Sequence, residues 1–234
     1  MSTISEAVGK NLDLGENLPL KELVYKAFRK TIILGEIPAG QRINEKEFSE
    51  VMNISRTPIR YAMQKLVEEG LVDHVLGVGI IVKGISINDA HEIYAIRKSL
   101  DVLATITAMK EMSIDDFKEL KDLLEETETL NERNEIDQVL QKFSDFNELI
   151  YEKSKMLRLK SIVMKLREYL VYFRDISIRS KERRDKALHE HWLIYQCMLD
   201  QKEEQLSLLI TEHLDYSQKF IIKEMEKHLH ETTK

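Results

Sequence analysis

Hydrophobic residues recur every three or four positions along most of this chain, and this spacing predicts helices. One stretch differs, because the β-branched runs L-V-D-H-V and G-I-I-V lie around the segment L-G-V-G, a pattern typical of a β-hairpin. The hairpin ends a first region, residues 18–84, and a linker at 85–88 leads into a helical second region at 89–228. Residues 1–17 and 229–234 have no clear period, so we expect flexible tails there.

The first region contains three predicted helices. One opens at Pro19 and runs to Gly35. After the turn G-E-I-P-A-G-Q-R-I, Asn44 and Glu47 stand at the spacing of a capping box that begins a second, short helix. The third helix covers residues 54–71. Three helices followed by a hairpin are typical of a winged helix-turn-helix.

The helix at 54–71 has a marked start, stop and face. Ser55 is a favourable N-cap because its hydroxyl can accept a hydrogen bond from a first-turn amide, and Pro58 falls in that turn, where a missing N–H costs nothing. Gly70 suits the left-handed position that ends a helix. The apolar stripe consists of Ile59, Met63, Leu66 and Val67. The other face carries Arg56, Thr57, Arg60, Gln64 and Lys65.

That polar face predicts contact with DNA. Arginine matches a guanine edge with a fork of N–H groups, and Gln or Thr can read bases or hold phosphates. A helix that buries one face and presents such a row fits a major groove. The alternative is an ordinary amphipathic helix whose polar face meets only water.

Six amphipathic helices are predicted in the second region, with no strand pattern or nucleotide-binding glycine motif between them. They cover about 89–112, 114–131, 135–153, 157–178, 184–200 and 202–228. An antiparallel six-helix bundle is the economical arrangement. Because the chain has only three prolines and eight glycines, its composition also favours a mainly α fold.

The formal net charge of −6 disfavours DNA binding if the chain is taken as a whole, but the charge is unevenly distributed along it. Residues 19–83 carry 10 Lys and Arg against 8 Asp and Glu, a balance of +2, whereas the rest carries 25 against 33, a balance of −8. A mildly basic first region is compatible with DNA binding through that region alone. One cysteine, Cys197, excludes an intrachain disulfide. With no membrane-spanning run or signal pattern, we expect a cytoplasmic protein that does not enter membranes.

Four polar residues interrupt apolar stripes on four of the bundle helices: Arg97, Asn147, His191 and His213. A guanidinium inside a bundle is costly unless an anion meets it. Each residue also has an ordinary explanation, since Arg97 could pair with Asp101 one turn away and the histidines could be satisfied core residues. Because four such residues occur together, a shared polar pocket is the better interpretation. Arg174 is a further candidate for that pocket.

Three motifs occur together in the first region: the turn G-E-I-P-A-G, the helix start S-R-T-P-I-R and the helix end L-V-E-E-G-L. Over Leu18 to Lys83 the chain resembles the DNA-binding head of the GntR family of bacterial transcription regulators. The resemblance implies DNA contacts from Lys46, Arg56, Thr57, Arg60 and Lys65. It also places the wing glycine, here Gly79, near the minor groove. A polar residue often precedes that glycine in the family, but Val78 stands here, and His74 and Lys83 are the nearest polar substitutes. We therefore expect the wing to add less to the affinity for DNA than usual.

The second region carries I-Y-A-I-R-K-S-L-D, F-N-E-L-I-Y, E-H-W-L-I-Y and T-E-H-L. These segments resemble the helical effector domain of the FadR-type (FCD) branch of the same family. Many members hold a divalent metal with one Asp and three His, beside a small carboxylate. The resemblance places Phe143 at the Asp position and Asn147 at the first His, while His191 and His213 match the other two.

Half of that ligand set is missing. Two histidines and an amide make a poor site for Zn²⁺ or Ni²⁺, which usually take at least three strong protein ligands, so only His191 and His213 are candidate metal ligands. Asp145 lies off the pocket face of its helix. We predict a metal-free or weakly metal-binding pocket that takes an organic anion directly. Arg97 supplies a fork to a carboxylate, and Asn147 and the two histidines supply hydrogen bonds.

The predicted function is a ligand-responsive transcription regulator, with repression the commoner outcome in this family. It is expected to bind palindromic operator DNA as a homodimer, because two-fold pairing doubles the few base contacts of one head. A small carboxylate effector in the helical domain would control that binding. The alternatives are a metal-dependent helical hydrolase using His191 and His213, and a protein-interaction module. We do not expect an enzyme, because no carboxylate base or nucleophile stands at catalytic spacing beside the histidines.

Overall fold

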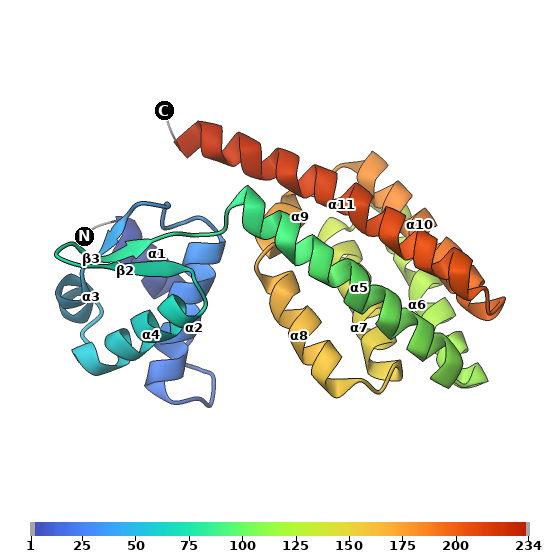
Figure 1. Ribbon diagram of the computed structural model, residues 1–234, viewed down its shortest axis with the longest axis horizontal. Helices are drawn as coiled ribbons and strands as arrows, with labels where there is room; N and C mark the ends of the chain where they lie inside the picture. Colours follow the sequence, from blue (N-terminus) through green and yellow to red (C-terminus); the bar gives the residue numbers. More distant parts are fainter. Residues whose placement is uncertain (1–2, 233–234) are drawn as a thin grey trace. The chain divides into compact units, whose positions relative to one another are not determined.

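The computed structural model describes residues 3–232, with side chains at 4–171 and 173–227. The chain divides after Ser86 into two compact units, here called the head and the bundle (Figure 1). The head contains α1 (Thr3–Asn11), α2 (Leu20–Ile33), β1 (Arg42–Ile43), α3 (Glu45–Val51), α4 (Arg56–Glu68), β2 (Val72–Val75) and β3 (Gly79–Val82). A winged helix-turn-helix followed by a helical unit confirms the predicted, mainly α fold class.

The core of the head lies where α4 packs on α2 and α3. Phe28 of α2 meets Phe48 of α3 edge-on, with ring centroids 4.8 Å apart. Burying a side chain of this kind stabilises the fold by about 1.5–3 kcal/mol. Val67 was predicted in the apolar stripe of α4 but is 39% exposed, because it lies about 80° around the helix from Ile59. The buried face consists of Ile59, Ala62, Met63 and Leu66.

Local signals set the ends of the head helices. Asn53 and Gly70 adopt left-handed backbone angles, with φ of 51° and 71°. They follow the ends of α3 and α4, where the sequence predicted that these helices stop. Asn44 caps α3, because its Oδ1 accepts from the backbone N–H of Lys46 at 3.1 Å. These three signals are short-range, and the sequence therefore predicted them correctly.

The predicted side-chain cap at Ser55 is wrong. Ser55 occupies the N-cap of α4 in an extended conformation, but its hydroxyl accepts no hydrogen bond from the helix. An N-cap oxygen usually accepts from the second or third amide of the helix. The third residue here is Pro58, which has no N–H to give. The proline that marks the start of the helix therefore removes one of the donors that the serine needs.

The hairpin pairs β2 with β3 in an antiparallel register from Val72 opposite Val82 to Val75 opposite Gly79. A third strand, β1, was not predicted. It pairs with the other edge of β3, so the sheet order is β1-β3-β2. With only two residues, β1 is too short to show an alternating pattern. It brings Arg42 beside the wing.

The prediction of a tail at residues 1–17 is wrong for Thr3–Asn11, which form α1 and pack against α2. Val8 is fully buried. Asn11 Nδ2 donates to Thr31 Oγ1 at 3.1 Å and to Glu36 Oε2 at 2.7 Å. A two-turn helix presents too few apolar residues for a period to stand out, so its packing partner decides its structure.

The bundle contains α5 (Ile87–Glu111), α6 (Ile114–Glu132), α7 (Ile136–Lys153), α8 (Leu157–Glu168), α9 (Val171–Ser177), α10 (Lys181–Leu199) and α11 (Glu203–Thr232). Its first and last helices lie side by side (Figure 1). The linker is shorter than predicted, because α5 begins at Ile87. The predicted tail at 229–234 is helical up to Thr232, and residues 233–234 lie outside the described part. No helix among the described residues is long and apolar enough to cross a membrane.

The helix predicted at 157–178 is two helices, so the described bundle has seven helices where six were predicted. Tyr169 ends α8, and Leu170, with φ −114° and ψ 7°, begins α9. Neither proline nor glycine marks the break, so no local signal predicts it. Leu170 is buried at the break. Packing therefore overrides the helical pattern here.

Candidate functional site

The outer face of α4 carries the residues predicted to contact DNA. Arg56, Thr57, Arg60 and Gln64 are exposed and lie within about 100° of one another around the helix. Lys65 lies outside that arc and is half-buried. Lys46 is exposed on α3. The structure therefore presents four side chains of α4 together, with Lys65 set apart.

Several of these cations have acidic neighbours within the head. Arg60 Nε lies 3.2 Å from Glu45 Oε2, and Lys46 Nζ lies 3.7 Å from Glu50 Oε1. The Glu68 carboxylate accepts a hydrogen bond from Lys65 and raises the pKa of that lysine. Exposed pairs of this kind are held weakly because water screens them, so a phosphate can replace the carboxylate.

The wing contains an arginine that the sequence did not reveal. Gly79 begins β3 with φ of 109°, a conformation that favours glycine. A Cβ placed there would lie 3.6 Å from Arg42 Nε, so the Arg42 side chain lies against the wing glycine. Val78, at the hairpin tip, is apolar and exposed. Arg42 of β1 therefore adds positive charge at the wing, beside the exposed Lys83 that follows β3. The exposed Arg42 before the buried Ile43 was the one available signal.

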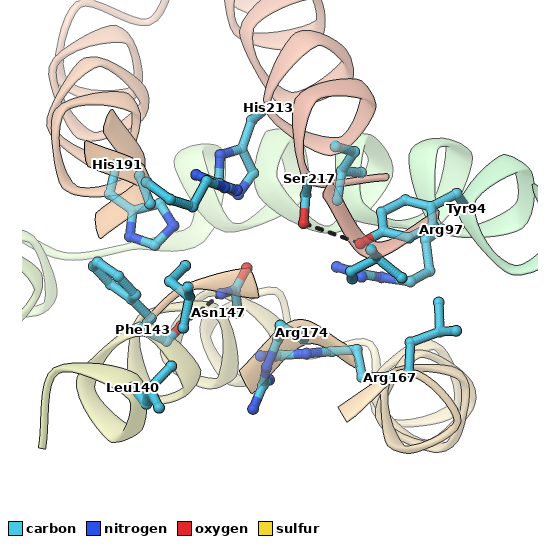
Figure 2. A pocket seen from close by; sticks show the side chains of 16 residues that line it. Tyr94, Arg97, Leu140, Phe143, Asn147, Arg167, Arg174, His191, His213 and Ser217 are labelled. Carbon is cyan, nitrogen blue, oxygen red and sulfur yellow. Dashed lines mark hydrogen bonds between the residues drawn. The ribbon is translucent and has the colours of Figure 1, made fainter. Parts of the chain in front are cut away.

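The bundle encloses a cavity of about 60 Å³. All five residues predicted for a shared pocket line it: Arg97, Asn147, Arg174, His191 and His213. In Figure 2, Asn147 and the two histidines project toward one space from three helices. Arg167 and Arg183 also line it, although neither was predicted.

At the end of the cavity that the histidines line, aromatic rings pack against the neutral imidazole of His191. His191 is 2% exposed and stacks on Phe146, with ring centroids 4.2 Å apart, while Phe143 meets it edge-on at 5.0 Å. Burial, followed by the nearby His213 and arginines, holds the pKa of His191 well below its usual value. Its Nδ1 is buried without a hydrogen-bond partner among the described residues. His191 can therefore offer or accept one hydrogen bond inside the cavity.

The two other predicted residues at this end are partly engaged. His213 Nδ1 lies 2.6 Å from Glu190 Oε2. Asn147 Nδ2 donates to the backbone oxygen of Phe143 at 2.7 Å, drawn as a dashed line in Figure 2. Both residues keep a second polar atom for a ligand.

These residues do not fit the divalent metal that the family resemblance implies. Phe143 puts a ring where the family has a carboxylate, and Asp145 is instead bonded to Gln141 at 2.8 Å. Two guanidinium groups, those of Arg167 and Arg183, act on His191 with positive charge. No group of three or more His, Cys, Asp or Glu within the described chain is arranged to hold a metal.

Arg97 has the internal partner that was considered as an alternative, but it is not fully satisfied. Its Nη2 lies 2.9 Å from Asp101 Oδ2, and Tyr151 donates to Asp101 Oδ1 at 2.8 Å. Burial lowers the pKa of Arg97, but the Asp101 carboxylate has the opposite effect, and the net result is a raised pKa. The Arg97 Nε atom is buried and has no partner in the described chain. Arg97 is therefore anchored by Asp101 with one N–H left over.

Arg167 is a buried charge that has no carboxylate within ion-pair distance among the described residues. It is 9% exposed, and burial lowers its pKa. Its Nη2 reaches Ser144 Oγ at 3.4 Å, and its buried Nη1 has no hydrogen-bond partner among the residues described. By contrast, Arg174 is half-buried and bonded twice to Asp175, at 3.0 and 2.9 Å.

Two adjacent arginines show how differently this bundle treats buried charge. Arg184 is 1% exposed and donates to the side-chain oxygens of Asn131 at 3.0 Å and Asn134 at 2.6 Å, and to the backbone oxygen of Arg179. Arg183 is 3% exposed, yet its Nε and Nη1 have no hydrogen-bond partner within the described structure. Its nearest carboxylate oxygen, Glu190 Oε2, is 3.9 Å away. Arg184 is structural, whereas Arg183 presents free donors.

The criterion that selected the predicted pocket also applies to the two missed arginines. Arg167 lies four residues after Val163 and three before Leu170, both buried. Arg183 lies four residues before Ala187 on the stripe of His191. Both are therefore polar residues on apolar stripes, but many exposed arginines in this chain obscure the signal.

Two family models match the chain, one in each unit. The model described as "Bacterial regulatory proteins, gntR family" matches residues 20–82, and the model described as "FCD domain" matches residues 92–216. These ranges agree with the resemblances that the motifs carry.

Relatives and solved structures agree with those matches. The HTH-type transcriptional regulator YdhC of Bacillus subtilis is 26% identical over 193 residues, which cover 82% of this chain and 86% of the relative. The HTH-type transcriptional repressor RspR of Escherichia coli is 22% identical over 201 residues, covering 86% and 88%. The solved structure of E. coli McbR/YncC shares the fold, with a TM-score of 0.64 at 20% identity over 89% of this chain and 99% of that one.

These relatives are transcription regulators, so the alternative of a metal-dependent hydrolase is wrong. With the winged head and the helical unit both matched, the chain belongs to the GntR family of bacterial transcription regulators, as a DNA-binding regulator with an FCD domain.

Proposed function

We propose that this regulator binds a small organic anion in the bundle cavity without a metal, and that the anion controls binding of the head to operator DNA. The observation that carries the proposal is the set of buried donors around the cavity. Arg97, Arg167 and Arg183 each bury at least one N–H with no acceptor among the described residues. Because an unpaired buried donor is costly, a cavity of this kind is stabilised when an anion enters it.

A bound metal is disfavoured for electrostatic reasons. A cation at the two histidines would be close to the positive charges of Arg167 and Arg183, which already act on His191. A carboxylate at the same place would be attracted by them. The same positive charges that disfavour a divalent ion therefore favour an anion.

In the head, we propose that Arg56, Thr57, Arg60 and Gln64 of α4 enter the major groove, while Lys46 and Lys65 contact phosphates. Gly79 allows the wing to approach the minor groove, and Arg42 supplies the positive charge that Val78 does not. A single head offers few base contacts, so we infer a homodimer on a palindromic operator. We further infer that the protein is a cytoplasmic repressor, as the relative RspR is a repressor by name.

Thermal melts test the anion site. Small carboxylates should raise the melting temperature in EDTA as much as without it, and a ligand at a hundred times its Kd adds about 2.7 kcal/mol of stability. If stabilisation needs Zn²⁺ or Ni²⁺, the metal-free site is wrong. If no carboxylate stabilises the protein, the cavity is not the effector site.

A further inference from the structure

The free donors of the cavity form two groups. Arg97 of α5 and Arg167 of α8 make one, in which Arg97 Nε and Arg167 Nη1 have no hydrogen-bond partner among the described residues. Arg183 of α10 makes the other, in which Nε and Nη1 lack a partner in the same part of the chain. A carboxylate in fork geometry places its two oxygens on one guanidinium, so one acidic group serves one of these groups.

The two groups have different contacts. Arg167 Cζ lies 5.9 Å from the ring centroid of Tyr151, whose hydroxyl donates to Asp101, the ion-pair partner of Arg97. Arg183 Cζ instead lies 4.9 Å from the ring centroid of Tyr216, and its Nη1 is 3.9 Å from Glu190 Oε2. We therefore assign the two groups to two ends of the cavity.

Each end lacks full compensation by protein carboxylates. At the first end, Asp101 pairs with Arg97, and no carboxylate among the described residues forms an ion pair with Arg167. At the second end, Glu190 is engaged by His213 at 2.6 Å and reaches Arg183 only at 3.9 Å. One acidic group on a ligand would compensate one end and leave the other uncompensated.

We propose, resting on the function proposed above, that the effector carries two acidic groups a short distance apart. One binds Arg97 and Arg167, and the other binds Arg183, with His213 and His191 beside it. The small cavity favours a short-chain diacid over a long one. A dicarboxylate and a carboxylate with a phosphate ester share this chemistry.

Calorimetry on the full-length protein tests the proposal in a phosphate-free buffer with EDTA. The probes are matched pairs that differ by one acidic group: malonate against propionate, and succinate against butyrate, with 2-phosphoglycolate to represent the phosphate esters. Each pair's diacid should bind at least tenfold more tightly than its monoacid. Tighter binding of 2-phosphoglycolate than of both dicarboxylates would identify the phosphate ester as the preferred form of the diacid, and the reverse order would identify the dicarboxylate.

Variants assign the two ends. Arg167→Gln and Arg183→Gln should each reduce the preference for diacid over monoacid to about threefold or less. Arg179→Gln, at an exposed arginine, is the matched control and should leave the preference unchanged. If Arg167→Gln does not fold, Arg167→Lys keeps a charge at that end and removes the fork, and it should still reduce the preference.

The outcomes separate this proposal from the one on which it rests. Equal affinity for monoacid and diacid, or a preference that survives both substitutions, overturns the two-ended site while the anion site stands. No binding by any of the five anions overturns the anion site itself, and the two-ended site with it.

Discussion

The head and the bundle both use arginine, in opposite ways. In the head, Arg60 is exposed and its Nε lies 3.2 Å from a carboxylate that water screens. In the bundle, Arg183 is buried and its Nε has no partner within the described chain. An exposed guanidinium can exchange partners freely and suits a long polyanion such as DNA. A buried one holds unmet donors in fixed positions and suits one small anion.

The largest effect is expected from Arg60→Ala in the head. It should remove base contacts worth about 1–3 kcal/mol in each half-site, and so abolish operator binding in a gel shift. Circular dichroism should stay unchanged because the side chain is exposed. Lys118→Ala, an exposed cation of the bundle, is the control and should bind normally. If Arg60→Ala still binds the operator specifically, α4 is not the recognition helix.

The next largest effect is a difference in the free energy of unfolding between variants of two adjacent arginines in the bundle. Arg184→Met should lower the free energy of unfolding by about 3 kcal/mol, because it leaves the two asparagine oxygens without their donor. Arg183→Met should change it by less than about 1 kcal/mol, or raise it, because methionine can keep the packing against Tyr216 and removes donors that have no partner among the described residues. Denaturant unfolding measures both. Equal destabilisation by the two would mean that Arg183 is structural too.

Much of the head could be predicted because its signals are local. Asn44, Asn53 and Gly70 act on the backbone within a few residues, and α4 follows from its apolar spacing. The strand β1 and helix α1 were missed because neither is long enough to show a period. Arg42 was missed with β1, since only strand pairing brings it to the wing.

The bundle was predicted in outline, and its cavity in part. Periodicity gives the helices and marks Arg97, Asn147, His191 and His213 as inward-facing, and the structure brings all four together. Periodicity does not give the rotation of one helix against another, so it did not show which arginines are buried with satisfied donors. The break between α8 and α9 depends on packing for the same reason.

The pH dependence of stability tests the neutral state of His191. Its pKa is depressed in the folded protein, so the unfolded state binds more protons once the pH falls below the unfolded value of about 6.5. Stability should therefore decrease as the pH falls below that value, by up to about 1.4 kcal/mol per pH unit from this group. In melts between pH 7.5 and 5, His191→Leu should show a shallower decrease. An unchanged slope would mean that His191 is not kept neutral by burial.

The smallest effect is expected at the wing. Arg42→Ala should weaken DNA binding by about threefold to tenfold on any sequence and reduce the salt slope by about one, because it removes one contact without base recognition. Fluorescence anisotropy at several salt concentrations measures both quantities. Lys10→Ala, an exposed cation in α1, provides the control. A sequence-dependent loss for Arg42→Ala would mean that the wing reads bases.

We propose that an anion held by buried arginines of the bundle controls DNA binding through exposed arginines of the head. The most direct test is to titrate a short diacid into the complex with an operator selected from a palindromic library, in EDTA, and follow anisotropy. A dose-dependent change in operator affinity is expected, which is lost in Arg183→Gln, together with an equal change in diacid affinity when DNA is present. If the operator affinity does not change with the diacid, or changes only when a divalent metal is added, control of DNA binding by a metal-free anion is wrong.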